Sequence, residues 1–130
     1  MNEFIIYGAG GHAKVILDIL IADSKHVNCF FDDFFSDQAF MNKTVAKYKQ
    51  AAEPNALMII GIGDNHVRQK LSEKIHHSYG KAIHPSSIIA GDAEIDEGTV
   101  VMHGSVIQAS SVIGKHCIIN TSASVDHDCI

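Results

Sequence analysis

The first half of the chain alternates short apolar runs with helical patterns. Residues 4–7, 27–31 and 56–60 are continuous apolar runs bounded by glycine or acidic residues, which is typical of buried strands. Apolar residues recur at helical spacing over residues 13–22 and 66–75. Strands that alternate with helices predict a parallel sheet with right-handed crossovers. In the second predicted helix, we expect Val67, Leu71 and Ile75 to share one face.

From residue 83 onward the hydrophobic pattern has a period of six, which fits neither a helix nor a simple amphipathic strand. A hexapeptide β-helix has this period, because each hexad forms one flat side of a three-sided coil. One series is aliphatic and should fill the interior: Ile83, Ile89, Ile95, Val101, Ile107, Ile113, Ile119 and Val125. A second series, four residues later, is small and should sit near the corners: Ser87, Ala93, Thr99, Ser105, Ser111, Cys117, Ala123 and Cys129.

These patterns predict an α/β fold in two parts. Residues 1–80 should form a Rossmann-like parallel-sheet domain, and residues 81–130 the start of a left-handed parallel β-helix. Because a solenoid stacks only on its own neighbours, its last coil needs a cap or a continuation. We therefore expect the sequence to be part of a longer protein. We also expect glycines at the corners, where positive φ is cheap: Gly91, Gly98, Gly104 and Gly114.

The composition of the chain argues against several classes of function. The formal net charge is −5 without a basic run, which argues against non-specific nucleic-acid binding. The three cysteines form no Cys-x-x-Cys pair, so we expect neither a disulfide framework nor a zinc site, and a reducing cytoplasm is the simplest location. No apolar stretch approaches the roughly 20 residues of a membrane-spanning helix. We expect no membrane insertion.

A glycine-rich loop, GAGGHA at residues 8–13, lies between the first predicted strand and helix. Glycines permit the tight turn and let backbone approach a phosphate, while the helix N-terminus presents free N–H groups. Gly10 and Gly11 are therefore candidate ligand contacts, against the alternative of a tight turn without a ligand. His12 either contacts a ligand or caps the helix, and the sequence favours neither.

Two further loops should end at the same sheet edge, where open α/β sheets bind ligands. Asp32 and Asp33 follow the second run, with a solvated turn as the alternative. Gly63 follows the third run, and Asp64 or Asn65 can be the N-cap of the next helix. The position of Asp32, 19 residues after Ala13, could also indicate an NAD site.

These loops, the hexads, and the later segments NTS (residues 120–122) and VDHDC (residues 125–129) together resemble the PglD/NeuD-like sugar acyltransferase family. The family comprises UDP-4-amino-sugar N-acetyltransferases and sialic acid O-acetyltransferases. The resemblance covers the whole sequence in the right order. It implies a cytoplasmic homotrimer that binds a UDP-linked amino sugar in the N-terminal domain, and acetyl-CoA on the β-helix between subunits.

The resemblance also implies roles for individual residues. The sugar nucleotide should contact the three loops at Gly10, Gly11, His12, Asp32, Asp33, Gly63, Asn65 and His66. The general base should be His127, with Asp128 beside it as the orienting acid, an aspartate where amine-acetylating relatives often have glutamate. We expect no metal cofactor, and the acetyl-CoA contacts should lie beyond residue 130.

The chemistry agrees with these residue types. An amine or hydroxyl that attacks a thioester loses a proton, and histidine titrates near the working pH. His103 has the equivalent place in an earlier hexad but should lie on another side of the coil. We expect surface or turn positions for His76, His77, His84 and His116, an inward amide hydrogen bond or a site-lining role for Asn120, and corner packing for Cys117 and Cys129.

Three functions remain open from the sequence. The first is N-acetyl transfer to an amino group of a UDP-linked amino sugar, with sugar O-acetylation as its close alternative. The second is a sugar-nucleotide-binding module without catalysis, because the sequence holds fewer than three full coils. The third and least favoured is a fragment of an NAD-dependent oxidoreductase.

Overall fold

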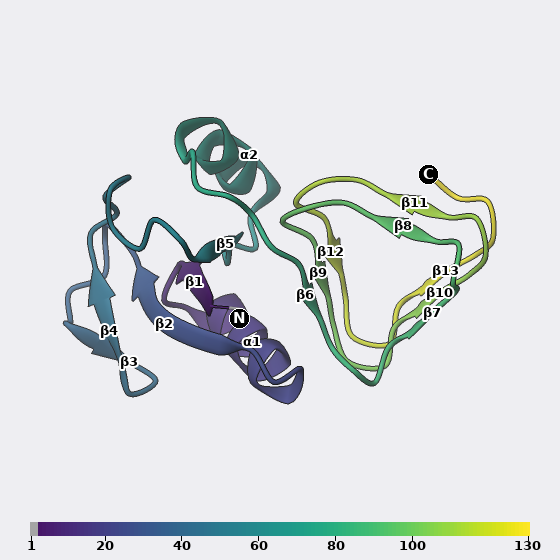
Figure 1. Ribbon diagram of the computed structural model, residues 1–130, viewed down its shortest axis with the longest axis horizontal. Coiled ribbons are helices and arrows are strands. Elements are labelled where there is room, and N and C mark those ends of the chain that lie inside the picture. The colour runs from purple at the N-terminus through teal and green to yellow at the C-terminus, as the bar shows by residue number, and fades with distance from the viewer. Residues whose placement is uncertain (1–2) are drawn as a thin grey trace.

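The computed structural model describes residues 3–130, which form a sheet unit followed by a three-sided coil (Figure 1). In the sheet unit, the strand order is β3-β4-β2-β1-β5, and all neighbours are parallel except β3 and β4. The first and second predicted strands are confirmed, and the third is β5. The strands are β1 (Glu3–Tyr7), β2 (His26–Phe31), β3 (Ala39–Phe40), β4 (Lys43–Ala46) and β5 (Leu57–Ile60).

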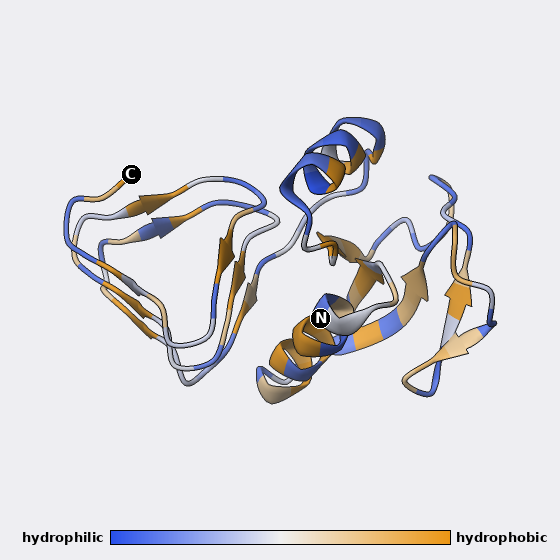
Figure 2. Cartoon of the chain, turned by 180° about the vertical axis from the view of Figure 1, so that it is seen from behind, coloured by the Kyte–Doolittle hydropathy of each residue, from blue (hydrophilic) through white to orange (hydrophobic). Residues whose placement is uncertain are grey.

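Two helices contact opposite faces of this sheet. Helix α1 (Gly11–Ala22) buries an apolar stripe that includes Ile16 and Leu20 against the face formed by Phe4 and Ile6. Helix α2 (Asn65–Lys74) is mostly polar (Figure 2) and contacts the other face only near its C-terminus. Side chains alternate across a strand, so β1 supplies both cores.

The predicted face of α2 is partly wrong. Leu71 and Ile75 pack in the second core, but Val67 is 45% exposed and Arg68 is the buried residue of this helix. The guanidinium of Arg68 makes four hydrogen bonds to carbonyl and amide oxygens, which offset the cost of removing a charge from water.

Eight short strands form the coil, and strands that lie 18 residues apart in the chain pair in parallel. Three hexads therefore complete one turn, as the six-residue period predicts. One side contains β6 (Ala82–Ile83), β9 (Val100–Val101) and β12 (Ile118–Ile119). The second contains β7 (Ile88–Ile89), β10 (Val106–Ile107) and β13 (Ser124–Val125), and the third β8 (Glu94–Ile95) and β11 (Val112–Ile113).

The prediction that the aliphatic series fills the interior of the coil is confirmed. All eight members of the aliphatic series lie in one apolar cluster, with Val101 and Ile107 almost completely buried. The small corner residues also have a polar role. Thr99, Ser105 and Ser111 are fully buried, and their hydroxyl groups donate to backbone carbonyls of the next coil, at Gly114, Asn120 and Asp126.

From residue 98 onward, left-handed backbone recurs every six residues, and glycine fills only the first two of these positions. Gly98 and Gly104 have positive φ, whereas Gly91 and Gly114 do not, so the prediction for these two glycines is wrong. The later members of the series are Ser110, His116, Ser122 and Asp128, with φ between 54° and 59°. Each precedes a small corner residue, so the coil geometry imposes the conformation despite its steric cost.

The two parts share an apolar core. Ala82, Val100 and Met102 on the β6–β9–β12 side pack in the same cluster as Ile16 and the rest of the buried face of α1. Alternation along each strand explains this arrangement, because Val100 points out toward α1 while Val101 points into the coil. Among residues 3–130, no helix is both long and apolar enough to span a bilayer.

The loop after β1 depends on a glycine at position 8. Gly8 has φ +114°, and a Cβ there would lie 2.7 Å from the carbonyl oxygen of Gly61. Gly8→Ala should therefore lower the free energy of unfolding by about 1–3 kcal/mol. Urea denaturation measures this change. The control is Gly91→Ala, where an added Cβ has no neighbour within 4 Å. Equal stability of the two variants would contradict the argument.

Candidate functional site at the carboxyl edge of the sheet

The three predicted loops do meet at the carboxyl edge of the sheet. The N–H of Gly8 donates to the carbonyl of Phe31, and the N–H of Gly61 donates to the carbonyl of Tyr7. The N–H of Ala9 donates to Oδ2 of Asp32 at 3.1 Å. The loops after β1, β2 and β5 are therefore held together by direct hydrogen bonds, and a single ligand could contact all three.

The acid pair after β2 is tied to the surrounding chain. Oδ1 of Asp32 accepts from the N–H of Phe34, in addition to the bond from Ala9. Asp33 accepts from the Tyr7 hydroxyl at 3.0 Å and from the N–H of Tyr48 at 2.9 Å. Burial, followed by the bond to Asp33, raises the pKa of Tyr7 to about 12. Both acids thus position the loops, whether or not they also contact a ligand.

The predicted glycines border open space. A Cβ built on Gly10, Gly11 or Gly63 would meet no other atom within 4 Å. Helix α1 begins at Gly11, its N-cap residue Gly10 provides no side-chain cap, and no acidic residue lies in its first turn. Backbone N–H groups at the start of α1 are thus available to an anion, and the helix dipole favours one there.

His12 has a ring nitrogen without a partner. Its Nε2 is buried and has no hydrogen-bond partner among the described residues. Burial, and secondarily the charge of Arg68, lowers the pKa of His12 below 6.5. Both effects favour the neutral form of the ring. The cap position belongs to Gly10, so the structure gives no support to a capping role for His12.

Arg68 is the residue that the sequence analysis missed. Its Nη1 donates to the carbonyls of Ile62 and Gly63, at 3.0 and 3.1 Å, and its Nη2 donates to Oδ1 of Asn65. Its Nε donates to the carbonyl of His116 in the coil at 2.8 Å. One guanidinium therefore connects the loop after β5 to the coil. The feature of the sequence that could have indicated this role is the position of Arg68, shortly after the loop that contains Gly61 and Gly63.

The other predicted residues of this loop take different positions. Asp64 is the N-cap of α2, because its Oδ1 accepts from the N–H of Val67. Asn65 is instead held by Arg68, and His66 is exposed. A pocket of about 530 Å³ lies between α2 and the coil. It is lined by Asn65, Arg68, Gln69, Ser72, Lys115, His116, Cys117, Ile118 and Ile119 and does not include the glycine loop.

His127 and Asp128 lie together after β13. Nδ1 of His127 is 2.8 Å from Oδ2 of Asp128, and both side chains are exposed. A proton on Nδ1 that donates to the carboxylate would leave Nε2 free to accept another proton. The pairing joins adjacent residues of one turn, in which Asp128 has a left-handed φ of 57°.

The sheet edge and the His127 pair do not meet within one chain. The sheet unit packs on the β6–β9–β12 side, while His127 follows β13 on a different side, near the corner where the chain ends (Figure 1). His103 follows β9, so the prediction that it lies on another side from His127 is confirmed.

Several remaining predictions need correction. His77 is buried between Tyr48 and Ala52, so it is not a surface residue. His116 lies in a turn, as predicted, and its ring packs against Tyr79. Asn120 is exposed, and its backbone carbonyl, not an inward amide, accepts from Ser105. Cys117 packs partly in the coil interior, whereas Cys129 is exposed.

The fold and the joined loops define a mixed α/β protein with parallel sheets. The family described as the PglD N-terminal domain matches residues 3–75, and the chain belongs to this family. It is 37% identical over 112 residues to a UDP-N-acetylbacillosamine N-acetyltransferase of Bacillus subtilis (strain 168). The match covers 78% of the chain and 52% of that protein.

Two solved structures are also similar. PerB from Caulobacter crescentus, in complex with CoA and GDP-perosamine, has a TM-score of 0.87 and 37% identity. The match covers 99% of the chain and 64% of PerB. The acetyltransferase domain of PglB from Neisseria gonorrhoeae FA1090, in complex with acetyl coenzyme A, has a TM-score of 0.86 and 28% identity, with 99% and 67% covered. The chain thus spans between about half and two thirds of these relatives.

The lowered pKa of His12 predicts a pH dependence of stability. The folded chain holds this ring neutral, whereas the unfolded chain protonates it near pH 6.5. Its contribution is therefore fully present above pH 6.5 and falls as the pH drops below that value. NMR titration of the His12 ring should give a pKa below 6.5.

The variant His12→Gln should flatten the decline of stability in acid, although His116, whose pKa is also lowered by burial, should retain part of it. Because burial is the larger cause for His12, Arg68→Met should restore only part of its shift. A His12 pKa at or above 6.5 would overturn this assignment.

Proposed function

We propose that the protein containing this chain transfers an acetyl group from acetyl-CoA to the amino group of a nucleotide-linked amino sugar, with a UDP-linked sugar as the first candidate. The observation that carries the proposal is the match of 99% of the chain to PerB, whose structure contains CoA and GDP-perosamine. The Bacillus subtilis relative, named as an N-acetyltransferase, supports amine over hydroxyl acetylation.

In this proposal, residues 1–80 are a Rossmann-like domain for the sugar nucleotide, and residues 81–130 begin a left-handed parallel β-helix of hexapeptide repeats. The parallel sheet with α1 and α2 on opposite faces supports the first assignment. The 18-residue pairing and the buried aliphatic series support the second. The free cysteines are consistent with a cytoplasmic location.

The sugar nucleotide would lie at the carboxyl edge of the sheet. Its diphosphate would accept from the N–H groups around Gly10 and Gly11, where the dipole of α1 adds favourable potential. Gly63, Asn65 and His66 would border the same ligand from the loop after β5. The neutral His12 ring offers a nitrogen that donates or accepts without bringing a charge.

Asp32 and Asp33 would act on the same ligand mainly by fixing the loops. Their carboxylates already accept two hydrogen bonds each from the chain. Each oxygen keeps a lone pair, so a further bond from a sugar or base group remains compatible with this geometry. An NAD site is less well supported. The acid that would bind the ribose of NAD is Asp32, and its carboxylate already accepts a hydrogen bond from the N–H of Ala9 in the glycine loop.

His127 would be the general base of the transfer. As the sugar nitrogen attacks the thioester carbonyl, a carbon–nitrogen bond forms and Nε2 of His127 takes the proton from nitrogen. The carbon–sulfur bond then breaks, and the proton passes to the sulfur of CoA as it leaves. Asp128, bonded to Nδ1, would hold the tautomer and stabilise the imidazolium.

A second copy of the chain would complete this site. Within one chain, His127 lies on a different side of the coil from the sheet unit (Figure 1). A symmetric assembly around the coil would bring the His127 of one subunit toward the sheet edge of another, in agreement with the homotrimer that the family resemblance implies. Acetyl-CoA would then bind between neighbouring coils.

Substitution at Gly10 tests the nucleotide site. Gly10 has φ −122° and ψ −162°, which valine adopts readily, and a Cβ meets nothing within 4 Å. Gly10→Val should leave the fold intact but project methyl groups into the space for the diphosphate. We expect binding of a UDP-linked 4-amino sugar to weaken by about tenfold or more, which is about 1.4 kcal/mol.

Calorimetric titration with UDP-linked and GDP-linked 4-amino sugars, and with NAD, measures this effect and also identifies the preferred nucleotide. The variant Gly91→Val provides a matched exposed control in the coil. Unchanged affinity in Gly10→Val would show that the loop is only a turn. Binding of NAD in preference to both sugars would overturn the proposed function.

Substitutions at His127 and Asp128 test the chemistry in the full-length protein. His127→Ala should lower kcat by about 100- to 10,000-fold, while affinity for the sugar nucleotide is unchanged. Asp128→Asn should also lower kcat, because an amide cannot stabilise the imidazolium as a carboxylate does. Asparagine tolerates the positive φ at this position, so the variant removes charge without backbone strain.

Release of free CoA measures turnover, and Asp126→Asn, an exposed acid on the same turn, is the control. Full activity of His127→Ala would exclude it as the base. Loss of nucleotide binding together with turnover would mean that His127 has a binding or structural role instead.

A further inference from the structure

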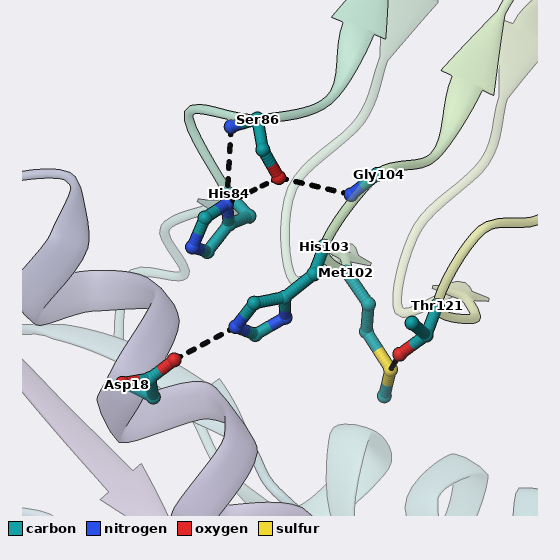
Figure 3. Close-up of polar contacts among 7 residues, drawn as sticks. All are labelled: Asp18, His84, Ser86, Met102, His103, Gly104 and Thr121. Carbon is teal, nitrogen blue, oxygen red and sulfur yellow. Dashed lines mark hydrogen bonds and ion pairs between the residues drawn. The ribbon is translucent and has the colours of Figure 1, made fainter.

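A cluster of two imidazoles and a carboxylate lies at the junction of the sheet unit and the coil (Figure 3). Asp18 is on the exposed side of α1, His84 follows β6, and His103 follows β9. Nε2 of His103 is 2.7 Å from Oδ2 of Asp18. One ligand atom from each of the three residues lies within 4.8 Å of the others.

The two imidazole rings are themselves in contact. Their centroids are 3.9 Å apart and their planes differ by 25°, so they stack. Both histidines are half-buried, and Asp18 reaches them from the helix surface. None of the three residues belongs to the sheet edge or to the His127 pair, so the proposed reaction does not account for this grouping.

We propose that Asp18, His84 and His103 form a binding site for a divalent transition-metal ion, with zinc as the best match. Imidazole nitrogens and a carboxylate oxygen are ligands that Zn²⁺ prefers, at about 2.0–2.2 Å. Two histidines and one carboxylate form a known three-ligand set that leaves a fourth position to water. The prediction of no metal rested on the spacing of cysteines, and this cluster contains none.

Ser86 supplies the outer support that such a site needs. Its Oγ lies 2.7 Å from Nδ1 of His84 and accepts from the N–H of Gly104 at 2.9 Å. The N–H of Ser86 also donates to Nδ1 of His84 at 3.0 Å, so without a metal Nδ1 accepts and Nε2 carries the proton of the neutral ring. Binding of a metal through Nε2 would shift this proton to Nδ1, which would then donate to the Ser86 hydroxyl. Metal-bound histidines usually have such a hydrogen-bond partner on the second nitrogen. Ser86 also links the turn of His84 to the turn of His103.

Metal binding would require a local rearrangement of these side chains. Ligand atoms around a tetrahedral zinc ion lie about 3.3 Å apart, so the His103–Asp18 pair would open slightly and the His84 nitrogen would move closer. The stacked rings would also tilt apart, so that both nitrogen lone pairs point to one ion. All three side chains are partly exposed, so no buried packing opposes these movements.

The location determines what such an ion would do. It would join α1 to the first two turns of the coil, beside the apolar core that the two parts share. A ligand that binds only the folded state raises stability by mass action. The metal would therefore fix the sheet unit on the coil, and it would not be a cofactor of acetyl transfer.

The test is titration of the metal-free chain with Zn²⁺ and with Co²⁺. We expect one ion per chain by calorimetry, a rise in Tm with Zn²⁺, and visible absorption of the Co²⁺ form typical of low coordination number. His103→Gln and Asp18→Asn keep the side-chain size and should weaken Zn²⁺ binding by about 100-fold or more, while Ser86→Ala should weaken it by about 10- to 100-fold, as other outer partners do.

His26→Gln, at an exposed histidine of β2, and His127→Ala serve as controls and should bind Zn²⁺ like the unmodified chain. Circular dichroism checks that each variant is folded. Absence of one-to-one binding in the unmodified chain would overturn the proposal. Binding that survives His103→Gln and Asp18→Asn but is lost in His127→Ala would place the ion elsewhere and would also overturn it. Neither result bears on acetyl transfer.

Discussion

The arrangement of this protein depends on one apolar core shared by α1 and a side of the coil. The side chains of Val100 and Met102 point outward from the coil and pack against α1, while the side chain of Val101, between them, lies in the coil interior. A two-residue strand thus serves two cores through simple alternation. Because apolar burial is the dominant favourable term in folding, this contact fixes the position of α1 on the coil. The Asp18–His84–His103 cluster exists only because α1 is held there.

Arg68 provides a second, polar connection between the sheet unit and the coil. Its guanidinium donates to two carbonyls of the loop after β5, to Asn65, and to the carbonyl of His116 in the coil. The fold places this buried cation near His12, and its charge adds to the effect of burial on the pKa of that ring. The loop proposed to bind a nucleotide is therefore shaped by the coil as well as by the sheet.

The two candidate sites are organised differently. The sheet edge is assembled from three loops far apart in sequence, joined by bonds such as that from Ala9 to Asp32. The pair of His127 and Asp128 is formed by adjacent residues in one turn. Stacking of coils places that turn on a different side from the sheet unit. Because of this separation, the proposed reaction calls for a neighbouring subunit.

The sequence by itself determined β1, β2, β5, both helices, the six-residue period of the coil and the meeting of the three loops, but not the short strands β3 and β4. Periodic burial is a local property, and all eight aliphatic positions of the coil follow it. Tertiary structure alone decided the burial of Arg68, the left-handed backbone of Ser110, His116 and Ser122, and the grouping of Asp18, His84 and His103. These features depend on contacts between residues distant in sequence, which no period or spacing records.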